Sequence, residues 1–425
     1  MSALTNRVRR QFTAFDLSFL TESTLLTIGI TIARVLGFGF SLVLARKLAP
    51  DDFGYVQYTL TLAGVIAIGT QPFVQHVMAR FVGKYHADDE RLQQTLHAIW
   101  WTLLGITTLT LVISVPVLIL TDRFSISVLV IFAGFTLFYG YYGLARGFLA
   151  SKRLLIAYLG SNIVQILAIL LFYEIGDVRS STPALLIYGL SYLLPIILLQ
   201  VVQPLPLYFR FSLPDKTILR ELLRFSLPVW ISHAAYIFYS GMDVLLLERY
   251  MDSSTVGVYV LTKTLTMLFS FVPVGLITVL LPKVAALPTH KHFALLKKSL
   301  IAVLLMNGAA LIVFALCYQW FVGTFINPDY VVPMDIMLMM ALSEVLFGFH
   351  GIITAVVVGG NNPQLETVSR IIIVITALVV GMILIPSLGL RGAALMKLAC
   401  GMVSLVTYLT AAVIRRRQRV RNVHA

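Results

Sequence analysis

Apolar stretches of about twenty residues recur along the whole chain, and they constrain its fold more than any other feature. An α-helix rises about 1.5 Å per residue, so roughly twenty apolar residues cross a hydrocarbon core about 30 Å thick. Short breaks rich in proline, glycine, asparagine and aspartate separate these stretches, as expected of turns. The sequence predicts twelve membrane-spanning helices, with approximate limits 20–45, 54–78, 94–120, 125–148, 155–175, 183–202, 227–248, 256–281, 299–322, 333–358, 364–386 and 390–414.

The composition supports a membrane protein. Hydrophobic residues make up 59% of the 425 residues and charged residues 12%, against roughly 45–50% and 25% in soluble domains. A chain this apolar cannot cover its surface with polar groups, which excludes a soluble enzyme, a disordered chain, a collagen-like fibre and a disulfide scaffold. The two cysteines, Cys317 and Cys400, both lie in apolar runs and indicate no redox compartment.

Basic residues fall mostly on one predicted side of the membrane. With twelve helices, 23 of the 32 Lys and Arg residues lie on the side that holds both chain ends, 6 lie on the other side and 3 lie inside spans. Arg370 lies just inside a span near the side of the chain ends and is counted with that side. Lys and Arg accumulate in cytoplasmic loops, so both termini are predicted to be cytoplasmic, and the net charge of +13 needs no nucleic acid to explain it. The first apolar run is too long for a signal peptide and contains Arg34, which indicates an uncleaved first helix.

The longest predicted loop separates two sets of six spans. We expect an N-terminal lobe over residues 1–205, a linker over 206–226 that forms an amphipathic cytoplasmic helix or a plain connecting helix, and a C-terminal lobe over 227–425. A short repeat supports this division, because Arg46 precedes Gly54 at the spacing with which Arg249 precedes Gly257. The predicted fold is an all-α polytopic membrane protein, with twelve transmembrane helices in two pseudo-symmetric six-helix lobes around a central cavity.

Six charged residues stand out within the predicted spans, where a charge near the bilayer centre costs at least about 2.5–3.5 kcal/mol. The rise per residue places Arg34 and Glu344 near the middle of the membrane, and Asp243 and Lys263 at similar depths in consecutive helices. We expect these groups to face an internal, hydrated space. They are Arg34, Asp243, Lys263, Glu344, Arg370 and Lys397.

Structural explanations compete with functional ones for most of these charges. Asp243 and Lys263 form either a structural ion pair or part of a functional site. Arg370 and Lys397 either extend to the membrane surfaces or face the cavity. Arg34 is too deep to reach a surface easily and has no opposite charge in its own helix, which favours a role in a ligand site or pathway.

Arg80 and Arg146, at predicted cytoplasmic helix ends, add to the basic groups within the spans and predict a cavity of positive potential. Guanidinium groups bind phosphate in a bidentate manner, so such a cavity favours a phosphate-bearing ligand. Asp243 and Glu344 are the predicted ion-coupling residues, and Glu344 is alternatively the partner of Arg34. The predicted substrate-binding residues are Arg34, Arg80, Arg146, Lys263, Arg370 and Lys397.

The sequence contains no G-x-x-x-x-G-K-[ST] loop, no H-E-x-x-H motif, no Cys/His metal cluster and no nucleophile elbow. It therefore predicts no cofactor and no metal, and transport that is passive or driven by ion or substrate gradients. A membrane enzyme such as a glycan polymerase is disfavoured, because the predicted outer loops are short and the loop at about 323–332 has Asp329 as its only charge.

Three regions carry short motifs in helix order. The first runs from Ala33-Arg34-Val35-Leu36-Gly37 through Leu44 to Gly54. The second runs from Leu222 to Pro228, then Met242 to Leu247 and Val256 to Tyr259, and the third from Leu384 to Leu395. Together they resemble the Wzx-type polysaccharide (O-antigen) flippases of the multidrug/oligosaccharidyl-lipid/polysaccharide (MOP) exporter superfamily, over most of the chain.

This resemblance implies a bacterial or archaeal protein of the cytoplasmic (inner) membrane that flips polyprenyl-pyrophosphate-linked oligosaccharides outward for surface polysaccharide synthesis. Two lobes would rock around a cationic cavity, with Arg34 where family members often carry a basic residue and Asp243 at an acidic position. The implied partners are membrane lipids, a polysaccharide polymerase and chain-length proteins. Peptidoglycan-precursor flippases of the superfamily usually have fourteen helices, so twelve favour the oligosaccharide branch. The alternative is a cation-coupled multidrug or small-molecule exporter, although these usually rely on acidic cavity residues.

Overall fold

The computed structural model describes residues 28–29, 31–148, 150–172, 180–208, 212–286, 289–359 and 363–424, and all the regular elements among them are helical. The chain divides into two compact units, which we describe separately. Unit 1 comprises Met1–Phe40, Gly69–Val178 and Leu185–Trp230, and unit 2 comprises Ser41–Ile68, Arg179–Ala184 and Ile231–Ala425. The start of the first predicted span and several basic loop residues lie outside the described residues, namely Arg7, Arg9, Arg10, Arg179 and Arg210.

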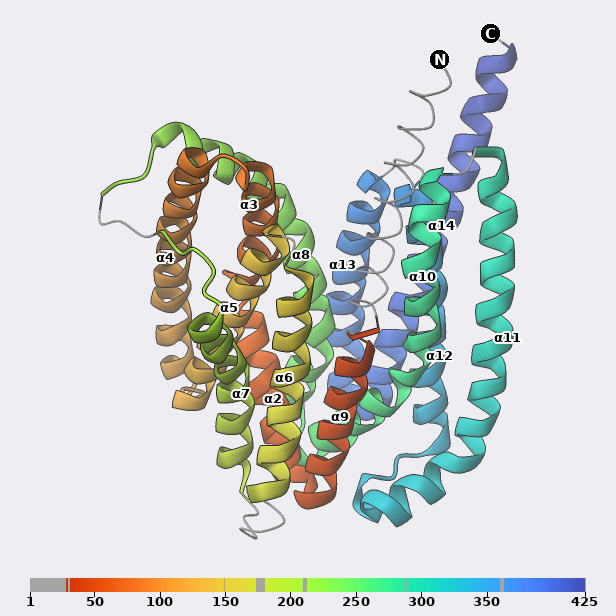
Figure 1. Ribbon diagram of the computed structural model, residues 1–425. Coiled ribbons are helices and arrows are strands. Elements are labelled where there is room, and N and C mark those ends of the chain that lie inside the picture. The colour runs from red at the N-terminus through yellow and green to blue at the C-terminus, as the bar shows by residue number, and fades with distance from the viewer. Residues whose placement is uncertain are drawn as a thin grey trace. The chain divides into compact units, whose positions relative to one another are not determined.

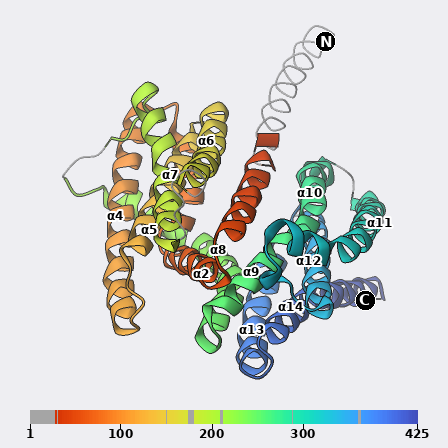
Figure 2. The same cartoon turned by 90° about the horizontal axis from the view of Figure 1, so that it is seen from below.

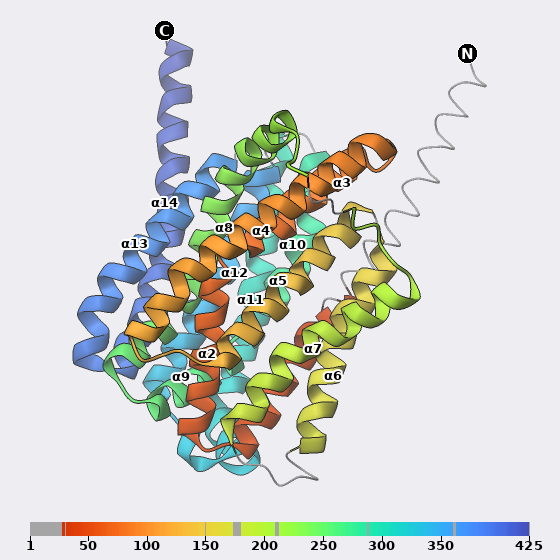
Figure 3. The same cartoon turned by 90° about the vertical axis from the view of Figure 1, so that its left-hand side faces the viewer.

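In unit 1, helix α5 is the central element, and two of its glycines allow close packing. A Cβ on Gly143 would lie 1.9 Å from the Val74 carbonyl oxygen, and one on Gly147 would lie 2.5 Å from Val82 Cβ. Figure 1 shows α3, α4 and α5 next to one another, and Figure 3 shows α6 and α7 running side by side. The elements are the π-helix η1 (Phe73–Met78), α3 (Ala79–Tyr85), α4 (Asp89–Leu120), α5 (Ile126–Gly147), α6 (Ser151–Leu170), most of α7 (Ser181–Val202) and the first part of α8 (Lys216–Tyr250).

Unit 2 contains the remaining helices. Helix α14 packs against both α12 and α13, and α10 packs against α12 (Figure 2). The elements are α2 (Pro50–Ile66), the rest of α8, α9 (Ser253–Thr266), α10 (Leu268–Ala286), α11 (Thr289–Phe321), η3 (Val322–Ile326), η4 (Pro328–Tyr330), α12 (Met334–Gly359), α13 (Pro363–Leu388) and α14 (Leu390–His424).

The two copies of the sequence repeat meet inside unit 2, where α2 packs along α9. A Cβ on Gly54 of α2 would lie 1.7 Å from the Ser253 carbonyl oxygen, and a Cβ on Gly257 of α9 would lie 2.2 Å from the Pro50 carbonyl oxygen. Because no side chain fits in either space, the close approach of these helices requires glycine at both positions. The repeat therefore marks a reciprocal helix crossing.

Local sequence explains where these two helices begin. Pro50 is the first residue of α2, where a backbone N–H has no partner to lose, and Asp51 and Asp52 in the first turn interact favourably with the helix dipole. Helix α9 follows Asp252, whose side chain accepts a hydrogen bond from the Thr255 N–H at 2.9 Å, a common N-cap arrangement.

The described residues contain eight helices that are long and apolar enough to cross a membrane, namely α4, α5, α6, α7, α11, α12, α13 and α14. Helices α9 and α10 make a ninth if the 41° bend between them lies within one span. Each of the twelve predicted spans overlaps helical structure, but the number of twelve crossings stays a prediction.

Three predicted segments differ from the structure. The span predicted at 54–78 is interrupted, since α2 ends at Ile66 and a π-helix follows Pro72, whose ring nitrogen cannot donate a hydrogen bond. The span predicted at 256–281 bends after Thr266, whose hydroxyl donates to the Lys263 carbonyl oxygen at 2.9 Å and so competes with the helical hydrogen bonds. The helix expected in the linker is continuous with the next span in α8, with Pro228 inside it.

Candidate functional site

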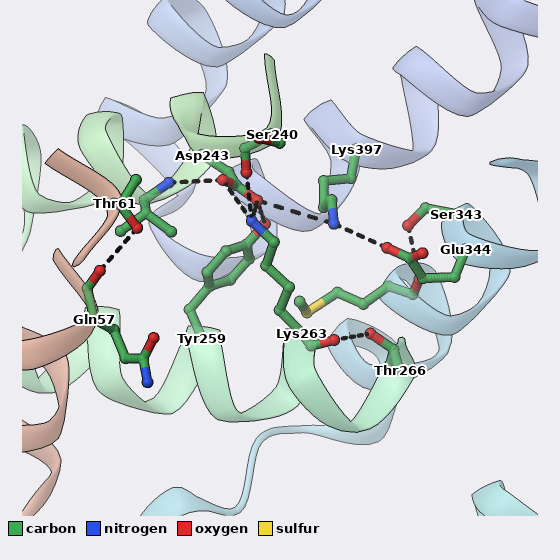
Figure 4. A network of polar contacts seen from close by, with 12 residues as sticks. Gln57, Thr61, Ser240, Asp243, Tyr259, Lys263, Thr266, Ser343, Glu344 and Lys397 are labelled. Atoms are coloured by element: carbon green, nitrogen blue, oxygen red, sulfur yellow. Dashed lines mark hydrogen bonds and ion pairs between the residues drawn. The ribbon is translucent and has the colours of Figure 1, made fainter. Parts of the chain in front are cut away.

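A buried charge cluster joins helices of unit 2 around Asp243 of α8 (Figure 4). The Asp243 side chain is only 2% exposed, and Lys263 Nζ of α9 lies 2.8 Å from its Oδ2 atom. Lys263 also donates to the Ser240 carbonyl oxygen at 2.9 Å. The Tyr259 hydroxyl donates to Asp243 Oδ2 at 2.8 Å, and the Val244 N–H donates to Oδ1 at 2.9 Å. Donors from α8 and α9 therefore surround this carboxylate.

Lys397 of α14 extends the cluster to α12. Its Nζ atom lies 3.0 Å from Glu344 Oε1 and 4.0 Å from Asp243 Oδ2. The side chains of Lys397 and Glu344 are 9% and 13% exposed. Two carboxylates and two ammonium groups thus balance one another, and we call Asp243, Tyr259, Lys263, Glu344 and Lys397 the Asp243 cluster.

This geometry decides between several of the alternatives left open by the sequence. Asp243 and Lys263 do form an ion pair, and Glu344 has Lys397 as its partner. Lys397 is buried in this pair instead of extending to a membrane surface. Because the cluster is neutral and its acids are occupied by lysines, a cation can bind there only if a lysine withdraws.

A second polar cluster surrounds Glu366 of α13. Arg370 Nε lies 2.5 Å from Glu366 Oε1, one turn along the same helix. The Tyr408 hydroxyl of α14 and the Thr354 hydroxyl of α12 donate to Glu366 Oε2 at 2.5 Å and 2.8 Å. His350 Nε2 lies 3.9 Å from the same oxygen. We call these five residues the Glu366 cluster, and it ties α12, α13 and α14 together.

Sequence reasoning missed Glu366, although it lies at the start of the span predicted at 364–386. The available signal was its position four residues before Arg370, a spacing that places opposite charges together on a helix. The Arg370 guanidinium also lies 5.2 Å from the centre of the Tyr236 ring. Arg370 is therefore engaged within unit 2 and does not extend freely to a membrane surface.

The basic residues predicted for the ligand path in unit 1 are exposed. Arg34 lies on the first helix, which covers residues 31–47 in the described chain. The Arg80 guanidinium lies 4.0 Å from the centre of the Phe225 ring, and Arg146 lies in the last turn of α5. Within the described part of the chain, none of these three arginines forms an ion pair with a carboxylate.

The helix that carries Arg34 packs against α6, whose Tyr158 belongs to an aromatic cluster built from α5, α6 and α7. The Phe138 ring lies 5.1 Å from the Tyr158 ring and 4.9 Å from the Tyr192 ring, measured between centroids. Sequence reasoning did not identify this cluster, although several of its members lie three or four residues apart on one helix face. The other members are Phe135, Tyr139, Tyr142 and Tyr188.

Among the described residues, no group of three or more His, Cys, Asp or Glu side chains could hold a metal ion. Asp243, Glu344 and Glu366 already interact with lysine, arginine or hydroxyl donors. The arrangement shows paired charges in unit 2 and exposed arginines in unit 1.

Solved structures with this architecture are transporters of the MOP superfamily. The lipid II flippase MurJ, in an inward closed conformation, gives a TM-score of 0.73 at 16% identity over 92% of this chain and 87% of that chain. An inward-facing multidrug resistance MATE transporter gives 0.70 at 16% identity over 93% and 96%. A MOP superfamily transporter from Pyrococcus furiosus gives 0.58 at 16% identity over 95% and 96%. The chain is therefore an all-α, multi-pass integral membrane protein with the fold of this superfamily.

Sequence comparison defines the family. Residues 19–288 match the profile of the polysaccharide biosynthesis protein family, and the chain belongs to this family. A search of curated proteins found no match. Membership confirms the predicted family resemblance.

Proposed function

We propose that this protein is a flippase that moves polyprenyl-pyrophosphate-linked oligosaccharide outward across the cytoplasmic membrane for surface polysaccharide synthesis. Membership of the polysaccharide biosynthesis protein family supports the substrate class. Similarity to the fold of a lipid II flippase supports the type of transport. The structural observation that carries the proposal is that Arg34 is exposed and that no carboxylate neutralises it within the described chain.

Arg34 differs from Lys263, Arg370 and Lys397 of unit 2 because no carboxylate of the described residues pairs with it. A guanidinium without a counter-ion is costly within a membrane, so it is expected to meet water or an anionic ligand. A pyrophosphate offers oxygens that accept two parallel hydrogen bonds from one guanidinium. The aromatic cluster next to the helix of Arg34 supplies hydroxyl groups and ring faces suited to the polar and apolar sides of a sugar.

The proposed topology is the one predicted from the sequence. It has twelve transmembrane helices, both termini in the cytoplasm of a bacterium, and two lobes over residues 1–205 and 227–425 around a central cavity. The lipid tail would stay in the bilayer during transport. A polysaccharide polymerase and chain-length proteins would act on the delivered substrate.

In this scheme the pyrophosphate head enters from the cytoplasm past Arg80 and Arg146, binds near Arg34, and leaves past Lys263 and Lys397. The exposure of the three arginines supports the first part of the path. The two lysines are paired in the structure, so they take part only after their ion pairs open.

Ion coupling offers a way to open these pairs. Uptake of a proton or cation by Asp243 or Glu344 would weaken the attraction to Lys263 and Lys397, because a neutralised carboxylate no longer balances an ammonium group. The released ammonium groups would then be available to the pyrophosphate. Arg370 would become available in the same way if its pair with Glu366 opened.

The experiment that tests the proposal replaces Arg34 with Ala and, separately, with Lys. Loss of charge-assisted hydrogen bonds worth about 1.5–3 kcal/mol predicts at least a tenfold fall in transport for Arg34→Ala. Arg34→Lys is expected to retain part of the activity. Transport is measured as flipping of a fluorescent polyprenyl-pyrophosphate oligosaccharide in proteoliposomes, and as surface glycan output in a deletion strain at equal expression.

Arg91→Ala is the matched control, because Arg91 is an exposed arginine at the start of α4 with a side chain 68% exposed. It should transport like the unmodified protein. Full glycan output from Arg34→Ala would remove Arg34 as a substrate ligand. Drug resistance that depends on Asp243 or Glu344, with normal glycan output, would instead favour the cation-coupled exporter.

A further inference from the structure

The first turns of α8 present two different faces within unit 1. On one face, Leu222 is fully buried, and Glu221 Oε1 accepts a hydrogen bond from Lys84 Nζ of α3 at 2.8 Å. Phe225 packs against Phe81 and beneath the Arg80 guanidinium. These contacts fix the rotation of the helix about its axis and so decide which residues point away from the core.

The opposite face carries three basic residues one turn apart, with leucines between them. Lys216, Leu219, Arg220, Leu223 and Arg224 line an open hollow of about 420 Å³. Their spacing of three and four residues places all five on the same side of the helix. The hollow is therefore apolar and positively charged at once.

The positive charge of this face is not cancelled locally. The Asp215 side chain accepts hydrogen bonds from the Thr217 and Ile218 N–H groups at the helix start, and Glu221 is engaged by Lys84 on the other face. Among the described residues, the three basic side chains of the hollow form no ion pair. An anionic ligand would balance the charge of these three side chains.

We propose that this face, Lys216 to Arg224, is a docking site for an anionic glycerophospholipid of the inner leaflet. Guanidinium and ammonium groups would hold the phosphodiester, and Leu219, Leu223 and the exposed Leu227 below them would contact acyl chains. Alternating basic and apolar side chains are typical of helices that lie at an anionic membrane surface. The site is distinct from the proposed substrate path and does not depend on flipping.

The test uses the full-length protein in nanodiscs and in detergent, with phosphatidylglycerol and phosphatidylcholine as probes and native mass spectrometry as the readout. Each basic residue that holds the lipid phosphodiester is expected to contribute about fivefold to binding. Lys216→Gln/Arg220→Gln/Arg224→Gln is therefore expected to lower the preference for phosphatidylglycerol by about a hundredfold. Arg220→Lys/Arg224→Lys should retain most of it, and salt should weaken binding in the unmodified protein.

The matched control is Lys291→Gln/Lys297→Gln/Lys298→Gln, which removes three exposed lysines of α11 and is expected to keep the preference. Equal losses in both triple variants, or no preference for phosphatidylglycerol in the unmodified protein, would overturn the proposal. Stronger binding of a polyprenyl diphosphate than of phosphatidylglycerol at this face would assign it to the substrate instead and would also overturn it. If the triple variant unfolds, the single variant Arg220→Gln carries the test, with an expected loss of about fivefold.

Discussion

Unit 1 and unit 2 use their charged residues in opposite ways. Unit 2 buries two acids and two bases in the Asp243 cluster and holds Glu366 with Arg370 and two hydroxyl groups. Unit 1 leaves Arg34, Arg80 and Arg146 exposed, without carboxylate partners in the described chain. The difference teaches that charges within membrane helices need not share one role. Paired charges join helices, whereas unpaired ones remain free to bind a ligand.

The largest expected effect comes from removing the central acid of unit 2. Asp243→Ala leaves Lys263 without its carboxylate in a buried place, and removal of one partner of a buried pair costs about 3–5 kcal/mol. We expect this loss in the free energy of unfolding, measured by SDS titration in mixed micelles. Asp335→Ala is the control, because Asp335 pairs with Arg391 at 2.9 Å with both side chains about half exposed, and it should cost less than about 1 kcal/mol. Similar losses in the free energy of unfolding for Asp243→Ala and Asp335→Ala would contradict the special role of the buried pair.

A double-mutant cycle between Glu344 and Lys397 asks whether the Asp243 cluster acts as a unit. Residues that share one ion-pair network show interaction energies of about 0.5–3 kcal/mol. We expect a value near the upper end for Glu344→Gln and Lys397→Met, since their side chains are largely buried and 3.0 Å apart. The free energies of unfolding of both single variants and of the double variant give this interaction energy. If the effects of the two single substitutions add up in the double variant, Glu344 and Lys397 have no interaction energy.

The Glu366 cluster should respond more weakly. Glu366→Gln removes the charge opposite Arg370, but the Arg370 side chain is 31% exposed and can reach water, so we expect a loss of about 1–2 kcal/mol. Glu221→Gln in unit 1 breaks a half-exposed pair with Lys84 and should leave unfolding unchanged within error.

The hydrogen bond to Glu221 raises the pKa of Lys84, so Glu221→Gln should lower that pKa toward its ordinary value, as NMR titration would show. Any stability from this pair is present at neutral pH and is lost only as the pH rises through the raised pKa of Lys84. A clear destabilisation by Glu221→Gln at pH 7 would contradict the contrast between the units.

A smaller cost than in either cluster is expected outside them, at the N-cap of α9. Asp252→Ala removes the hydrogen bond to Thr255 and should cost about 1 kcal/mol. Hydrogen bonds from Thr255 lower the pKa of Asp252, so its contribution is present above the ordinary aspartate pKa of about 3.9 and is lost as the pH falls through the lowered value. The difference in free energy of unfolding between the variant and the unmodified protein should therefore vanish in acid. A difference that persists in acid would contradict the expected pH dependence.

Several features of the site were predictable because they depend on distance along the chain. The pairing of Asp243 with Lys263 followed from their equal distances from one helix hairpin, since each residue of a helix advances by a fixed rise. Glu366 and Arg370 are four residues apart, and the same reasoning would have paired them. The family also followed from short motifs in order along the sequence.

Other features depend on which helices become neighbours. Lys397 and Glu344 lie on α14 and α12, and either could have met a different charge in another packing arrangement. The rings of the aromatic cluster in unit 1 come from three helices, and their periodicity along each helix does not say that the faces converge. The glycines of the repeat were visible, but their reciprocal contact between α2 and α9 was not.

The sequence by itself determined that this protein lies in a membrane and to which family it belongs. Membrane thickness and the helix rise per residue together fix the length of an apolar run that crosses the membrane. Both are distances along one helix axis, so this length can be read from the sequence alone. Tertiary structure alone decided which charges neutralise one another and which remain available, because the energy of a buried charge depends on partners within a few ångströms. Those partners are chosen by helix packing, at glycine crossings and side-chain contacts that join residues far apart in the chain.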